Sequence, residues 1–135
     1  MTQLPWDCVV LGVPASVQGS SGARTRWKAA VASAAQAAWP AGTPPLDHEV
    51  SVRLTYFHEE APLDVDNMIK PIQDALIGIS FIDDSQVRDV QASLRDLNGT
   101  YLMRGIGRAL AEGFMSNEPF VHIRIETAKN PKELP

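Results

Sequence analysis

Residues 49–58 read Glu-Val-Ser-Val-Arg-Leu-Thr-Tyr-Phe-His and decide the fold class. Apolar and polar side chains alternate along this stretch, with Val50, Val52, Leu54 and Tyr56 on one face and Ser51, Arg53 and Thr55 on the other. A period of two is typical of a β-strand with one buried face. We therefore expect a strand here whose apolar side packs on a core.

Three further strands and three helices are predicted around this strand. The strand candidates are an apolar run at Cys8–Val13 and two alternating stretches at residues 90–95 and 121–126. The helix candidates are Ala23–Trp39, Asn67–Ile79 and, as a weaker pattern, Met103–Phe114. This order of elements predicts one α+β domain with a mixed sheet of about four strands, packed with two or three helices.

Length and composition agree with a small globular protein. The 135 residues fit one domain, expected at residues 1–128, followed by a loose tail at 129–135. The chain is 44% hydrophobic and 21% charged. We see neither a stretch long enough for a membrane helix nor a signal peptide, so we expect a cytoplasmic protein without a membrane partner.

The net charge and the single cysteine limit the function classes. A net charge of −4 argues against a non-specific DNA coat, because affinity for DNA comes largely from Lys and Arg. It does not exclude a nuclease, since carboxylates that hold a cation also count in the net charge. Cys8 lies in an apolar run and is expected to be a small buried hydrophobe rather than a nucleophile.

Acidic residues gather around the predicted helix at Asn67–Ile79. Asp64 and Asp66 precede this helix, and Asp83 and Asp84 follow it. Mg²⁺ prefers carboxylate oxygens, and carboxylates that cluster without a cation repel one another. A helix of about 13 residues is roughly 20 Å long. The two pairs can therefore meet only if the chain folds back, with the strand after Asp84 beside the strand before Asp64.

The acidic pairs also have an ordinary structural explanation. Asp64 or Asp66 can cap the helix, and Asp83 with Asp84 can form a solvated turn. Pro71 argues for something more, because proline inside a helix removes a hydrogen bond and clashes with the preceding turn. The helix must start late or kink at this point, and departures from local rules often accompany functional sites.

A longer run of motifs is more specific. Asp64-Val65-Asp66-Asn67 with Lys70 is followed by Asp74-Ala75-Leu76 and, after a short apolar link, by Asp83-Asp84-Ser85-Gln86-Val87. In order and spacing this run resembles the RusA family of Holliday junction resolvases. The resemblance implies a RusA-like fold and a Mg²⁺-dependent endodeoxyribonuclease, with Mn²⁺ as a possible substitute. Its substrate would be branched DNA, the four-way junction of recombination and repair.

The resemblance also implies roles for individual residues. Asp64, Asp66 and Asp84 match the acidic catalytic residues that bind Mg²⁺ in the family, and Lys70 matches the lysine that supports catalysis. Asp83, next to Asp84, is a further candidate metal ligand. The family works as a homodimer, which suits a four-way junction because two related strands must be cut.

Other residues carry weaker expectations. Asp74 is expected to support the fold, and the segment from Tyr101 to Ser116 to be an insertion between the last two strands. Candidate phosphate contacts, each also explained by a solvated surface, are Arg24, Arg26, Lys28, Arg104 and Arg108. Two other functions stay open: a branched-DNA-binding protein that has lost cleavage, and a metal-dependent nuclease acting on flap DNA or RNA.

Overall fold

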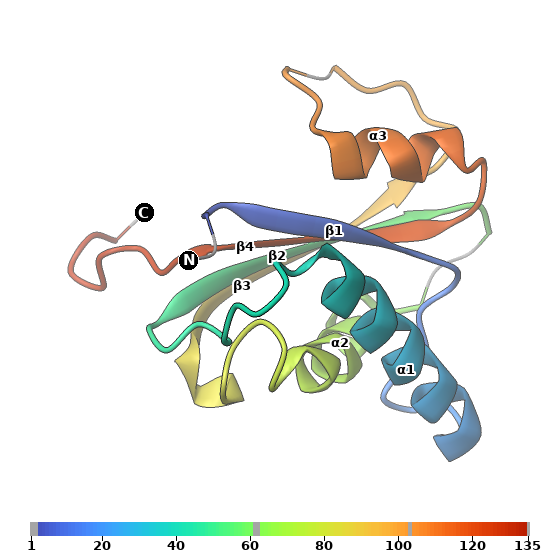
Figure 1. Cartoon of the computed structure of the whole chain (residues 1–135). Helices are drawn as coiled ribbons and strands as arrows, with labels where there is room; N and C mark the ends of the chain where they lie inside the picture. The colour runs from blue at the N-terminus through green and yellow to red at the C-terminus, as the bar shows by residue number, and fades with distance from the viewer. Residues whose placement is uncertain (1–2, 61–62, 103, 135) are drawn as a thin grey trace.

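A four-stranded mixed sheet forms the centre of the computed structural model, which describes residues 3–60, 63–102 and 104–134 (Figure 1). The strands are β1 (Trp6–Leu11), β2 (Val50–His58), β3 (Val87–Asp96) and β4 (Phe120–Thr127). They lie in the order β1-β4-β2-β3. β2 and β3 are parallel, and the other neighbours are antiparallel. The predicted α+β class with a mixed sheet is confirmed.

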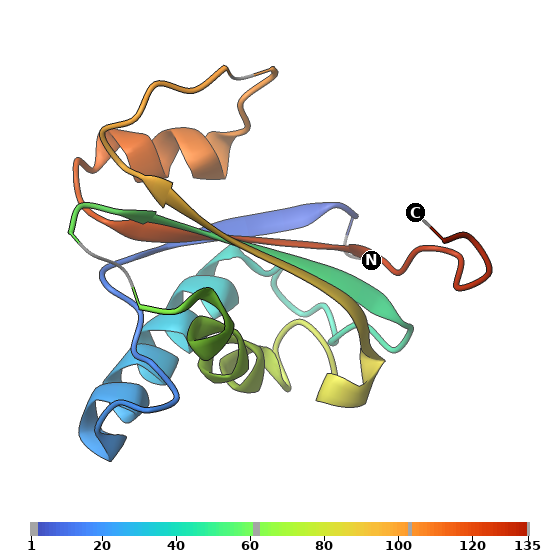
Figure 2. The same cartoon turned by 180° about the vertical axis from the view of Figure 1, so that it is seen from behind.

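Helices cover both faces of the sheet. The α-helices are α1 (Ser21–Ala38), α2 (Ile69–Leu76) and α3 (Arg108–Met115), and the short 3₁₀ helices are η1 (Val65–Met68) and η2 (Asp84–Gln86). α1 and α2 lie on one face and α3 on the other (Figures 1 and 2). Across the described residues, we find no helix with the length and apolar character needed to cross a membrane.

Several boundaries differ from the prediction. The first strand begins earlier than Cys8, at Trp6, and ends at Leu11 because Gly12 leaves the extended conformation with a φ of 117°. The last predicted helix begins at Arg108; its expected start, Met103, lies outside the described residues. Residues 129–134 of the expected tail contain no helix or strand, and Pro135 is outside the described part.

The predicted effect of Pro71 is confirmed. The expected helix is divided into η1 and α2, and α2 begins only at Ile69. Pro71 is therefore the third residue of α2, where a backbone N–H has no partner within the helix. The proline is buried and fits the first turn without breaking it.

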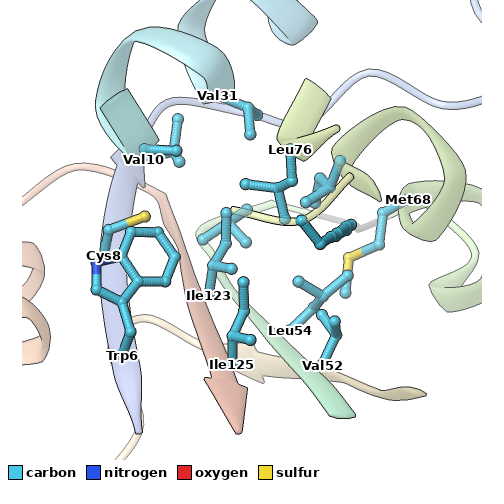
Figure 3. Close-up of a cluster of buried hydrophobic side chains, with 14 of the residues drawn as sticks. Trp6, Cys8, Val10, Val31, Val52, Leu54, Met68, Leu76, Ile123 and Ile125 are labelled. Atoms are coloured by element: carbon cyan, nitrogen blue, oxygen red, sulfur yellow. The ribbon is translucent and has the colours of Figure 1, made fainter. Parts of the chain in front are cut away.

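The main core lies between the sheet and the α1–α2 face (Figure 3). α1 contributes Trp27, Val31 and Ala35, spaced by four residues so that they share one side of the helix. Trp39, the residue that follows α1, is buried in the same core. Cys8 is buried in this core as expected, and burial raises the pKa of its thiol to about 12.

A second, aromatic cluster lies under α3. Phe57 of β2 stacks on Phe120 of β4 at 4.7 Å between ring centroids, and Phe114 of α3 packs edge-on against both. Gly113 of α3 is buried directly over the Phe120 ring. A side chain at this position would occupy the space that the ring fills, so the glycine sets how closely α3 approaches the sheet.

Gly113→Ala tests this close approach. The added Cβ would lie 2.5 Å from the Phe120 ring, so we expect the free energy of unfolding to fall by about 1–3 kcal/mol in urea titrations. Gly22→Ala in the exposed first turn of α1 is the matched control, because its Cβ meets only the mobile end of Arg26. The control should be neutral or stabilised by up to about 1 kcal/mol; equal losses in both variants would contradict this account.

Candidate active site

The two acidic pairs lie at opposite ends of α2. Because β2 and β3 run parallel, the end of β2 and the start of β3 are at opposite edges of the sheet along the strand direction. Asp64 and Asp66 follow β2, whereas Asp83 and Asp84 come directly before β3. The eight residues of α2 alone span about 12 Å. Figure 2 shows η1 and η2 separated by α2.

One chain does not bring the pairs together. The strand after Asp84 does lie beside the strand before Asp64, but it is parallel to that strand instead of folding back along it. Among the described residues there is no group of three or more Asp, Glu, His or Cys side chains that could hold a metal ion. The candidate site is thus present as two separate acidic segments.

The segment of Asp64 and Asp66 has a fixed backbone and exposed carboxylates. Met68 is fully buried below it, and the Asn67 carbonyl accepts a hydrogen bond from the Val17 amide over 3.1 Å. Asp64 occupies the N-cap position of η1, but its side chain makes no capping hydrogen bond. The expected capping role is therefore absent here, and both carboxylates face solvent.

The segment of Asp83 and Asp84 is held by Gln86. Its amide nitrogen donates to the carbonyls of Leu46 (2.8 Å) and His48 (2.9 Å). Its amide oxygen accepts from the backbone amides of Ile82 and Asp83 over 2.7 and 2.9 Å. Sequence reasoning missed this clamp, although a glutamine three residues after an aspartate is a capping-box signal.

Asp83 and Asp84 differ in their surroundings. The Asp83 side chain caps η2 by accepting a hydrogen bond from the Ser85 amide, and hydrogen bonds from Ser85 hold the pKa of the Asp83 carboxyl below its ordinary value. Asp84 is exposed. The capping role of Asp83 fits the turn interpretation, while Asp84 is the more available ligand of the two.

Asp74 joins α1 to α2 through two lysines. Its carboxylate lies 3.6 Å from the Lys28 ammonium and 3.2 Å from that of Lys70, and it is only one-quarter exposed. The expected structural role of Asp74 is consistent with these contacts. Lys70 itself is 68% exposed and lies one helical turn after Asp66.

The basic candidates are spread over separate surfaces. Arg24 donates to the carbonyls of Val17 and Gly19, so it holds the loop before α1. Arg108 approaches Glu112 at 3.8 Å, and Arg26 and Arg104 are exposed. The prediction that Arg104 and Arg108 share a helix is wrong, because α3 begins at Arg108.

A cleft of about 560 Å³, whose lining includes neither acidic segment, lies between the sheet and the C-terminal residues. Its cations are largely balanced by neighbouring anions. Arg88 pairs with Glu49 at 3.1 Å, and Arg124 pairs with Glu126 at 2.7 Å. This balance makes the cleft a poor phosphate site despite its size.

The same substitution, Asp to Asn, can be made at Asp74, whose carboxylate contacts two lysines, and at Asp66, whose carboxylate is free. The pair of variants shows which carboxylate contributes to stability. Loss of the Asp74 charge removes both lysine contacts, so the free energy of unfolding should fall by about 1 kcal/mol. Asp66→Asn should change it by less than about 0.5 kcal/mol. Urea titrations at low and high salt measure both effects, and the interpretation is wrong if Asp66→Asn is the more damaging change.

Comparison with known proteins identifies the family. The family model described as endodeoxyribonuclease RusA matches residues 20–126, which extend from the start of α1 to the penultimate residue of β4. A search of curated proteins gave no match. The matched region contains both acidic segments and Lys70. This chain therefore belongs to the RusA endodeoxyribonuclease family.

Proposed function

We propose that the protein is a Mg²⁺-dependent endodeoxyribonuclease that cleaves Holliday junctions in DNA recombination and repair, as a homodimer. Family membership supports the reaction class. The structural observation that carries the proposal is the exposure of Asp64, Asp66 and Asp84 on rigid turns at the ends of α2. Exposed carboxylates on a fixed frame are suited to binding a cation beside a phosphate.

The separation of the pairs implies that two copies build each site. Asp64 and Asp66 cannot approach Asp84 of the same chain while β2 and β3 stay parallel. In a homodimer, the first pair of one copy can instead meet the second pair of its partner. Twofold symmetry then generates two equivalent sites, one for each of the two strands to be cut.

The donor set fits a hard divalent cation. The three free carboxylates offer only oxygen ligands, and neither acidic segment contains a cysteine or a histidine in its sequence. Asp64 and Asp66 of one copy with Asp84 of the other would hold Mg²⁺, or Mn²⁺ as a substitute, which activates water and neutralises phosphate charge when bound. Asp83 would orient this set through its cap on η2.

Lys70 would act on the phosphate. Its ammonium group is exposed and is held on the helix by Asp74 four residues away. In this position the positive charge offsets the negative charge that develops on the scissile phosphate during hydrolysis. The contact with Asp74 restricts the lysine without burying it, so the side chain can still reach a bound strand.

Cleavage of a labelled mobile four-way junction is the direct test. Wild type should give paired nicks with Mg²⁺ and none with EDTA, and Asp66→Asn should lose at least about 10³-fold in rate while retaining DNA binding. Asp74→Asn should still cleave. Binding without cleavage by the wild type would favour a binding protein, and stronger cleavage of flap DNA or RNA would favour the other nuclease class; either result would contradict the proposal.

Mixed dimers test whether each site is shared between copies. Asp66→Asn and Asp84→Asn should each be inactive alone, but co-expression should restore nicking, because half of the mixed dimer's sites then carry no substitution. With random pairing, about a quarter of the wild-type number of sites is expected.

The control mixture joins Asp64→Asn with Asp66→Asn. These substitutions affect the same acidic segment, so both sites of every mixed dimer remain damaged and no nicking should return. If the first mixture also stays inactive although mixed dimers form, the sites are not shared.

A further inference from the structure

The outer edge of β3 is open. β3 is the last strand in the sheet order and pairs with β2 on one side; within the described part of the chain no strand pairs with its other side. It is ten residues long and contains no proline. A long edge strand is a ready template for pairing with another chain, and the devices of β3 that could discourage such pairing, a register shift and four charged residues, lie near its two ends.

The backbone orientation along this edge can be assigned. The Arg95 guanidinium donates to the carbonyl of Leu94 over 2.8 Å, which indicates that this carbonyl points to the open edge instead of to β2. Backbone groups alternate in direction along a parallel ladder, so Val90 and Ala92 present their N–H and C=O groups to the same edge. These three residues provide the hydrogen-bonding positions for a new strand.

We propose that this edge pairs with β3 of a second copy, antiparallel and centred on Ala92. The twofold axis then runs through the Ala92 pair, perpendicular to the sheet, and the two four-stranded sheets become one continuous sheet. The inference deepens the proposed function by naming its dimer surface, and it rests on that function only for the link to the acidic segments.

The sequence of β3 is self-complementary in this register. Asp89 of one copy lies opposite Arg95 of the other, and Val90 lies opposite Leu94. Arg88 does not add to this match, because it lies at the register shift at the start of β3 and pairs with Glu49 of its own chain at 3.1 Å. Facing residues in an antiparallel pair share one side of the sheet, so each of these contacts can form.

Neighbouring registers lose this match. Centring the pair on Gln91 would place Asp89 opposite Ser93, and centring it on Ser93 would place Asp96 opposite Val90. Both leave the charges unpaired. In all three registers the outward-pointing backbone groups lie opposite one another, so the charge match is what favours the Ala92 register.

The same pairing brings unlike acidic segments together. Antiparallel pairing places the start of β3, where Asp83 and Asp84 lie, beside the end of the partner's β3. η1 contacts β3 within each chain, on the side of the sheet covered by α1 and α2. Asp83 and Asp84 of one copy therefore lie beside the edge of the partner's sheet at which the partner's Asp64 and the partner's Asp66 are located.

Exposed apolar side chains accompany both segments and the strand between them. Ile82 before η2 is 57% exposed, Val65 between the two aspartates of η1 is 37% exposed, and Val90 on β3 is 41% exposed. In the proposed dimer Ile82 of one copy approaches Val65 of the other. Burial of these side chains against a second copy would add apolar contact to the strand pairing.

Charge exchange across the edge tests the register. Asp89→Arg and Arg95→Asp each place like charges opposite one another twice per dimer, and each should raise the dimer Kd at least about tenfold. The double variant restores opposite charges and should return the Kd to within about threefold of wild type. Sedimentation velocity over a concentration series, without DNA or divalent cation, measures the three values.

Lys132→Asp is the matched control, because it makes the same change of charge as Arg95→Asp at an exposed position in the C-terminal segment. It should dimerise like wild type. A monomeric wild type, single variants that dimerise normally, or a double variant that stays dissociated would each overturn the interface. Junction cleavage is assayed separately. If the variants change the dimer Kd as expected but the wild type does not nick junctions, the nuclease proposal is refuted and the interface still stands.

Discussion

The parallel pairing of β2 with β3 is the constraint on which the rest of the structure depends. Parallel neighbours cannot be joined by a tight turn, so the chain must return along the whole length of the sheet before the second strand begins. η1 and α2 form this return connection. Their side chains Met68, Ile72 and Leu76 are fully buried against the sheet. The acidic segments are the two ends of this connection, and the core that stabilises the domain also holds them apart.

Rigidity at both ends of the connection has different origins. At η1 it comes from burial of Met68 and from one backbone hydrogen bond to the loop before α1. At η2 it comes from the Gln86 side chain, which joins its own turn to residues about forty positions earlier. Such support fixes where a carboxylate lies before any ligand arrives, which reduces the ordering that binding would otherwise require.

The amino-acid pattern predicted the helices and strands better than it predicted how they are arranged relative to one another. Alternation identified β2, and the position of Pro71 correctly indicated a late helix start. β3 extends beyond the predicted stretch, because an edge strand needs no apolar alternation at Arg88 and Asp89. The acidic residues were identified by their motif, but strand direction was not, since periodicity is the same for parallel and antiparallel neighbours. The Gln86 clamp depends on contacts distant in sequence and leaves no periodic signal.

The placement of the acidic residues at the two ends of one connection also affects how the cleavage activity depends on protein concentration. Under the proposed assembly, a newly made chain carries two half-sites and is harmless to DNA until it meets another copy. While single chains predominate, the number of complete sites grows with the square of the protein concentration. Modest changes in expression would then produce steep changes in the nicking of junctions.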